Sequence, residues 1–163
     1  MVKPGETMLC GPPYSLSSLH PESVAQFCDP NAFLFVPCPL SADVLWAAET
    51  ALRSGSVKNV IIIAERSPGL TNFRRLQLAA LNGKSLGLMI VDKPAHSTAA
   101  ETRWHCTPVV TDELGEVRFH ASLYKNKKGT IGSWVVNVLG EENTLHLDAK
   151  PAGEPVWPGR VAG

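Results

Sequence analysis

The sequence lacks an excess of charge of either sign, because Lys plus Arg and Asp plus Glu both number 15 among its 163 residues. This balance excludes a basic field over the whole protein, so contact with nucleic acid would need a local patch. The sequence also lacks an apolar run near the ~20 residues that span a bilayer, and it shows no signal-peptide stretch. With 44% hydrophobic residues, we expect a cytoplasmic globular protein without a membrane partner.

Cysteine pairs at metal-binding spacing are also missing. The four cysteines, Cys10, Cys28, Cys38 and Cys106, are scattered over apolar segments, and none forms a Cys-x-x-Cys pair. A zinc site needs ligands clustered in pairs, so we expect buried free thiols, with neither metal nor cofactor. His105 precedes Cys106 directly, and neighbouring side chains of a strand point to opposite faces. The two are therefore not a catalytic dyad.

Short apolar strands alternate with helices over the first hundred residues. The segment 59–64 is β-branched and apolar on both faces, which is typical of a central parallel strand covered by helices. The helices are expected to start after the N-cap residues Ser41 and Thr71 and to end at Gly55 and Gly83. The sequence predicts strands at 7–10, 32–36, 59–64 and 86–91, a short helix at 21–27, and longer helices at 42–53 and 72–81. Such alternation predicts a parallel sheet with right-handed crossovers.

The pattern changes after about residue 100. Four strand-like segments, 104–110, 117–124, 134–139 and 144–147, are separated by hairpin-like connections and by no helix-length segment. We interpret them as an antiparallel extension of the sheet. The Pro- and Gly-rich residues 149–163 are expected to be a flexible tail, and 1–148 to be one domain. The fold class is α/β, with a three-layer core around a mostly parallel central sheet and an antiparallel C-terminal extension.

A phosphate-binding loop is also missing. The run Gly83-Lys84-Ser85 resembles the end of one, but the full motif needs a glycine where Leu78 stands. The context is inverted as well, because a phosphate loop leads from a strand into a helix. Glu65 follows a buried strand, as a magnesium-linked carboxylate does in ATPases, yet it has no loop lysine to cooperate with. We therefore expect a protein that is not an enzyme and has no catalytic residue.

Four residues of the two long helices are candidates for contact with a partner. Trp46 lies off the face that carries Val44 and Ala48, so it either packs at the edge of the core or projects toward a partner. Arg74, Arg75 and Gln77 project away from the apolar face of the second helix. They form either a solvated face or a docking surface, because arginine is favoured in interfaces.

A dense basic cluster lies between the second and third C-terminal strands. It contains Lys125, Lys127 and Lys128 in the run Lys125-Asn126-Lys127-Lys128-Gly129-Thr130. The cluster is either a solvated turn or a contact for a phosphate backbone or a neighbouring subunit's anionic ligand.

Several segments taken together resemble the ImuA family. The run from Val44 to Gly55 is similar to its "LWAxExALRSG" segment, and 74–80 is similar to its "RRLQLAA" helix. Residues 97–104 resemble its "SAAATRWRV" segment, Gly132-Ser133-Trp134 its "GSW", and Gly11 to Tyr14 the early "PPY". The resemblance covers roughly residues 7 to 140. Each piece is weak alone, and their combination in this order is fairly specific.

The resemblance implies a RecA-like accessory factor of damage-induced (SOS) mutagenesis and translesion DNA synthesis, without catalysis of its own. It implies as partners an ImuB-like polymerase-family protein, RecA or an error-prone replicative polymerase. The run Lys125-Asn126-Lys127 resembles lysines that RecA offers across its filament interface. Family members usually carry a segment before the part seen here, where the phosphate-loop unit of the core would fall, so we expect either a short form of the protein or a fragment.

Two other functions stay open. The same core is similar to SulA, an SOS inhibitor of cell division that binds FtsZ, although SulA-like chains tend to finish soon after the strand equivalent to 86–91. The four further strand-like segments favour the ImuA resemblance over this alternative. The third hypothesis is direct DNA binding through the Lys125–Lys128 loop, with Arg74 and Arg75 as further contacts.

Overall fold

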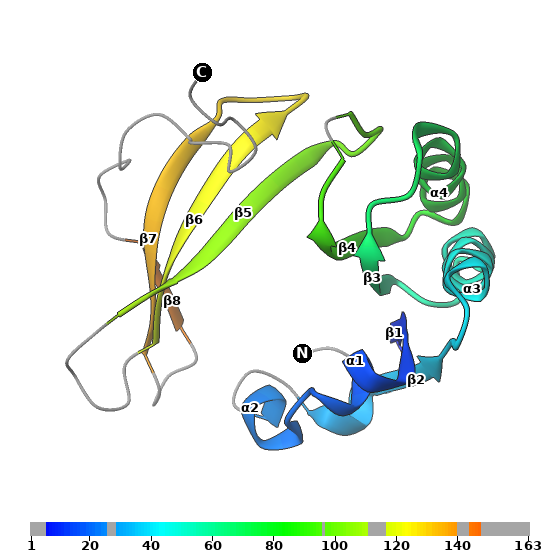
Figure 1. Cartoon of the computed structure of the whole chain (residues 1–163), viewed down its shortest axis with the longest axis horizontal. Coiled ribbons are helices and arrows are strands. Elements are labelled where there is room, and N and C mark those ends of the chain that lie inside the picture. The colour runs from blue at the N-terminus through cyan, green and yellow to red at the C-terminus, as the bar shows by residue number, and fades with distance from the viewer. Residues whose placement is uncertain (1–5, 26–28, 96, 111–116, 140–143, 148–163) are drawn as a thin grey trace. The chain divides into compact units, whose positions relative to one another are not determined.

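The computed structural model describes residues 6–25, 29–95, 97–110, 117–139 and 144–147. The chain divides into two compact units, Met1–Ala99 and Ala100–Gly163 (Figure 1). The division falls where the sequence changes from alternating strands and helices to hairpins. Among the described residues, no helix is long and apolar enough to cross a membrane. The predicted tail, 149–163, lies outside the described residues.

The first unit is built on a parallel four-stranded sheet. Its order is β2-β1-β3-β4, and each neighbouring pair is parallel. The strands are β1 (Thr7–Gly11), β2 (Phe33–Pro37), β3 (Asn59–Arg66) and β4 (Leu86–Lys93). The predicted α/β class with a parallel sheet is confirmed. The short elements α1 (Pro13–Ser17), α2 (Pro21–Ala25) and η1 (Pro30–Ala32) connect β1 to β2.

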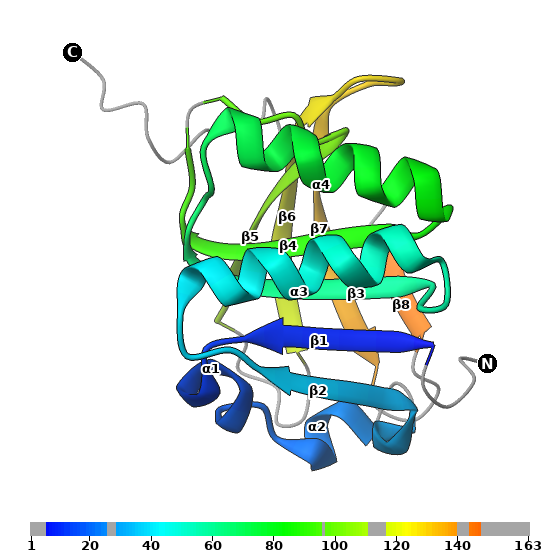
Figure 2. The same cartoon turned by 90° about the vertical axis from the view of Figure 1, so that its right-hand side faces the viewer.

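Two long helices, α3 (Ser41–Ser54) and α4 (Leu70–Gly83), lie side by side over the sheet (Figure 2). Their apolar residues recur at helical spacing and pack on alternate residues of the central strands. The core comprises Met8, Cys10, Cys38, Val44, Ala48, Ala51, Leu52, Val60, Ile62, Leu76 and Ala79. Leu52 and Ile62 are at most 2% exposed, and burial of such a side chain contributes about 1.5–3 kcal/mol.

The caps of both helices differ from the sequence prediction. Ser41 is the first residue of α3 and Thr71 lies in the first turn of α4, and no side chain caps either helix. Gly55 is the left-handed C-cap of α3, as predicted, with φ of 67°. The left-handed residue after α4 is Lys84, with φ of 51°, and Gly83 is still helical.

Gly83 lies at a point of the helix where α4 is in close contact with α3. A Cβ built on Gly83 would lie 1.8 Å from the carbonyl oxygen of Leu52, and one on Gly55 would lie 2.8 Å from the carbonyl oxygen of Gly83. The C-terminal ends of α3 and α4 therefore touch backbone to backbone. Ser85 adds a hydrogen bond, because its hydroxyl donates to the Leu52 carbonyl at 2.8 Å.

The second unit is an antiparallel sheet with the order β5-β6-β7-β8. Its strands are β5 (Thr102–Val109), β6 (Val117–Asn126), β7 (Gly132–Leu139) and β8 (Thr144–Leu147). The predicted antiparallel strands are confirmed, but the expectation that they extend the parallel sheet is wrong, because they pair with one another in a sheet of their own. A bulge interrupts the β5–β6 register between Arg103 and Trp104.

The glycine contact gives a stability prediction. We expect Gly83→Ala to lower the free energy of unfolding by more than about 2 kcal/mol, because a new methyl group would overlap the Leu52 carbonyl. The control is Gly69→Ala, since a Cβ at Gly69 meets nothing within 4 Å; its cost is expected below about 1 kcal/mol. Urea denaturation followed by circular dichroism measures both, and equal effects would contradict the prediction.

Candidate functional site

A groove lies between the N-terminal halves of α3 and α4. It has a volume of about 290 Å³, and its lining combines apolar with polar side chains. The lining residues are Ala42, Leu45, Trp46 and Glu49 of α3 and Asn72, Arg75 and Leu76 of α4. Two of the predicted contact residues, Trp46 and Arg75, are therefore brought together on one surface. The groove opens where the helices no longer touch through Gly55 and Gly83.

Trp46 is the exposed edge of this groove. Its side chain is 69% exposed, because it lies off the face of α3 that buries Val44 and Ala48. The interpretation that Trp46 projects outward is confirmed, and the alternative of core packing is wrong. Leu45, its neighbour in the chain, is partly buried against the core.

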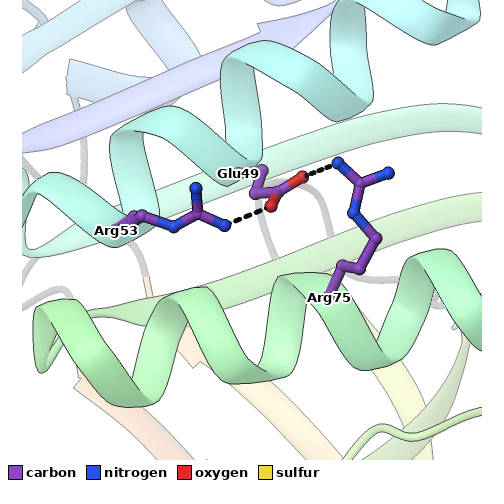
Figure 3. Close-up of polar contacts among 3 residues, drawn as sticks. All are labelled: Glu49, Arg53 and Arg75. Atoms are coloured by element: carbon purple, nitrogen blue, oxygen red, sulfur yellow. Dashed lines mark hydrogen bonds and ion pairs between the residues drawn. The ribbon is translucent and has the colours of Figure 1, made fainter.

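A shared carboxylate joins the two helices across the groove (Figure 3). Arg75 of α4 donates from Nη2 to Glu49 Oε2 at 2.6 Å, and Arg53, one turn after Glu49, donates from Nη2 to Oε1. The arginine side chains are about 60% exposed, whereas Glu49 is 12% exposed. Such exposed ion pairs stabilise a fold by about 0.2–1 kcal/mol each. Their main effect is to hold two guanidinium groups in place.

The remaining helix candidates lie on the outer side of α4. Arg74 donates from Nη1 to Gln77 Oε1 at 2.5 Å within the same helix. Neither lines the groove. Leu70, Leu78 and Leu81 of the same helix are 44–65% exposed, so the outer face of α4 is more apolar than the sequence analysis expected.

Sequence reasoning missed Glu49, Arg53 and Asn72 as members of this site. The spacing of Glu49 and Arg53 is four residues, which is a recognisable helical ion pair. Their meeting with Arg75 depends on how α3 and α4 pack, and 26 residues separate Glu49 from Arg75. No local pattern contains that information.

The basic cluster of the second unit is partly neutralised by its own sheet. Lys127 forms an ion pair with Glu101 at 3.0 Å, and its backbone N–H donates to the Glu101 carbonyl. Lys125 is half-buried and lies opposite Arg103 in the β5–β6 register. Burial, followed by the charges of Lys127 and Arg103, lowers the pKa of Lys125. Lys128 is exposed, and its backbone N–H donates to the Asn126 side chain at 3.1 Å.

The turn that carries these lysines is shaped by Asn126. Its side-chain amide donates to the Thr130 carbonyl at 3.2 Å, and its side-chain oxygen accepts from the backbone N–H of Lys128. Arg103 lies over the ring of Tyr124, with 4.9 Å between the guanidinium carbon and the ring centroid. The lysine loop is thus an ordered turn at one end of the β6–β7 hairpin.

Tyr14 lies at the edge of the parallel sheet where α/β proteins usually bind ligands. The strand order reverses beside β1, and ligands of such sheets bind outside the carboxyl ends of the strands at that point. Here Gly11 brings β1 against β3, since a Cβ at Gly11 would lie 2.9 Å from Cβ of Ile63. The Tyr14 hydroxyl, three residues later, donates to Glu65 Oε1 at 2.5 Å. Glu65 therefore contacts a phenol of its own chain.

The thiols differ in their surroundings. Cys10 and Cys38 are free and buried, as predicted, and burial raises the pKa of Cys10 to about 12. Such a thiol stays protonated and is a poor nucleophile. The prediction is wrong for Cys106, which is exposed on β5, the strand at the end of the antiparallel sheet order. Cys28 lies outside the described residues. Within the described ranges, no group of three or more potential metal ligands occurs.

No family model matches the chain, and no curated protein is similar to it in sequence. Among solved structures, SulA from Pseudomonas aeruginosa is similar, with 22% identity and a TM-score of 0.45. The match covers 55% of this chain and 71% of that chain. These figures carry no assignment of function.

The contact between Tyr14 and Glu65 can be tested by titration. The hydrogen bond to Glu65 raises the pKa of Tyr14 above its ordinary value of 10.0. Because the folded-state pKa is raised, the stabilisation is present below pH 10 and is lost as the pH rises through the folded pKa. In Glu65→Ala, we expect one tyrosine to ionise at lower pH in absorbance at 295 nm. Tyr14→Phe identifies the transition, since Tyr124 is the other of two tyrosines. Superimposable curves for wild type and Glu65→Ala would exclude the contact.

Proposed function

We propose that this chain is a non-catalytic accessory protein of bacterial damage-induced (SOS) mutagenesis and translesion DNA synthesis, and that it acts through protein contacts. The observation that carries the proposal is the 69% exposed Trp46 at the edge of the α3–α4 groove. The two segments that resemble the ImuA family most closely, 44–55 and 74–80, supply the lining of this groove, apart from Ala42 and Asn72. The segments that resemble the family therefore also form the exposed groove.

The composition of the groove supports protein contact. Trp and Arg are enriched among the residues that dominate binding energy at protein interfaces. Burial of a large apolar side chain contributes about 1.5–3 kcal/mol, and an aromatic ring that stays in water does not gain this energy. Trp46 is such an exposed ring, and it lines the same groove as Arg75. An exposed aromatic side chain and an ion-paired guanidinium group that line the same groove are the kind of surface that a partner protein recognises.

Three observations support a role without catalysis. The phosphate-loop motif is incomplete, because Leu78 stands where its first glycine would be, and Gly83 packs against Leu52 instead of cradling a phosphate. Tyr14 contacts Glu65 at the strand ends where an α/β protein would hold a ligand. Cys10 is a buried, protonated thiol. The partners we propose are an ImuB-like polymerase-family protein, RecA or an error-prone replicative polymerase.

The proposal predicts a mutagenesis phenotype. Deletion of the gene is expected to lower ultraviolet-induced mutation frequency about tenfold or more, and the wild-type chain should restore it. Trp46→Ala should not restore it, because it removes the exposed anchor. The control is Arg66→Ala, which changes an exposed residue at the end of β3, outside the groove. An unchanged mutation frequency after deletion, or robust ATP hydrolysis by the purified chain, would contradict the proposal.

A SulA-like inhibitor that binds FtsZ is the alternative function. It shares the strand-and-helix core of the first unit and leaves the separate sheet formed by β5 to β8 without a role. Overexpression distinguishes the two functions. Filamentous cells and blocked FtsZ polymerisation would support inhibition of division, whereas normally dividing cells would support the mutagenesis role.

DNA binding is a second candidate, favoured by the pairing of Arg103 with Lys125 across β5 and β6. This register places two cationic side chains next to each other on one sheet, and the charge of Glu101 also acts on Lys125. Lys127 and Lys128 follow in the adjoining turn, and Glu101 is the acidic partner of Lys127.

This candidate predicts salt-dependent DNA binding. In filter binding at two salt concentrations, changing Lys125, Lys127 and Lys128 together to Ala should weaken binding and lower the salt dependence, because fewer phosphates are neutralised. The control is Lys58→Ala, an exposed lysine of the first unit. Unchanged binding by the triple variant would reject the lysine loop as a DNA contact.

A further inference from the structure

The α3–α4 groove indicates the chemistry of its partner. Its apolar lining consists of Ala42, Leu45, Trp46 and Leu76, and its polar lining consists of Glu49, Asn72 and Arg75. The volume of about 290 Å³ is just below the ~300–1,000 Å³ range of small-molecule pockets. The groove therefore fits one large side chain of a partner better than a nucleotide.

The charge of the groove is fixed by three residues. Two guanidinium groups, Arg53 and Arg75, share the single carboxylate of Glu49, which leaves one net positive charge. Glu49 is 12% exposed, whereas the arginines are about 60% exposed. A partner that approaches from solvent therefore meets mainly the cations, and the less exposed carboxylate lies between them (Figure 3).

The arginines retain the capacity to bind a second carboxylate. Each contacts Glu49 through one nitrogen, Nη2, and a guanidinium group carries five N–H donors. Because the contact with Glu49 fixes the side chain, little further rotamer entropy would be lost when a carboxylate of the partner binds. Arg75 also lines the groove together with Trp46, so an acidic group on Arg75 would lie near an apolar group on Trp46.

We propose that this groove binds a short acidic segment of a partner protein, which packs an aliphatic or aromatic side chain against Trp46 and places a carboxylate on Arg75. This inference rests on the proposed function, because it names the partner's chemistry at the same surface. A phosphate backbone is a poorer occupant, since the groove lining holds a carboxylate, Glu49, beside its one guanidinium group, Arg75, and the apolar lining would stay uncovered.

The experiment uses the purified full chain and a library of random 12-residue peptides displayed on phage. The selected peptides are synthesised with a fluorophore, and their dissociation constants are measured by fluorescence anisotropy. We expect them to carry Asp or Glu within four positions of Leu, Phe or Trp. Trp46→Ala and Arg75→Glu should each raise the dissociation constant about tenfold or more.

Two controls make the test specific to the groove. Arg74→Glu makes the same charge change one residue earlier, at a side chain that bonds Gln77 of the same helix and does not line the groove. It should change the dissociation constant less than twofold. A peptide whose acidic residue is changed to Lys should regain affinity for Arg75→Glu and lose it for the wild type. Because Arg75→Glu places two carboxylates near each other, Arg75→Ala and circular-dichroism melting of all variants check that the fold persists.

The inference is overturned by peptides that bind Trp46→Ala and Arg75→Ala as tightly as the wild type, by selected peptides that are basic, or by a selection that yields no binder. Displacement of the peptides by single-stranded DNA that itself requires Trp46 would assign the groove to nucleic acid and would equally overturn it. The proposed function fails separately, because it is measured by the mutation frequency of the deletion strain, which involves no peptide.

Discussion

The backbone contact between the ends of α3 and α4 is the constraint on which the helix layer depends. With Gly83 against the Leu52 carbonyl and Gly55 against Gly83, the two helices approach as closely as backbones allow. The contact fixes their spacing and their relative rotation at the C-terminal ends. The N-terminal halves carry larger side chains, among them Leu45 and Leu76, and the groove lies between these halves. The groove is therefore a geometric consequence of glycine at one end and bulky side chains at the other.

The groove is then given its electrostatic character by Glu49. The carboxylate lies where it can reach Arg53 on its own helix and Arg75 on the neighbouring helix. Because each guanidinium group is paired with this carboxylate, neither arginine can turn away without breaking an ion pair. The contribution of each pair to stability is small, about 0.2–1 kcal/mol. The pairs also restrict the two long arginine side chains to the rim of the groove, so Trp46 stays accessible.

The sequence predicted the individual strands and helices, but it did not predict which residues of separate elements contact one another. Periodicity located the parallel strands and both long helices, because each depends on local spacing of apolar residues, whereas it left Trp46 open between core packing and exposure. The predicted N-caps were wrong, since Ser41 and Thr71 lie inside the helices and cap neither, whereas the Gly55 C-cap was predicted correctly. The role of Gly83 was also missed, as it depends on Leu52, which is 31 residues earlier. The same holds for Arg75 with Glu49 and for Tyr14 with Glu65: each contact joins residues from separate elements, and only tertiary packing brings them together.

The position of Tyr14 favours protein contact through the helices over ligand binding at the strand ends. In parallel α/β sheets, the carboxyl ends at the reversal of strand order provide the usual ligand crevice, because loops diverge there. In this chain Gly11 draws β1 onto β3, and the phenol of Tyr14 contacts Glu65 across the ends of those strands. A carboxylate that would serve a ligand thus accepts a hydrogen bond from its own chain. The helix layer, with its exposed tryptophan and two fixed guanidinium groups, offers a surface that other proteins can contact while the sheet serves as its support.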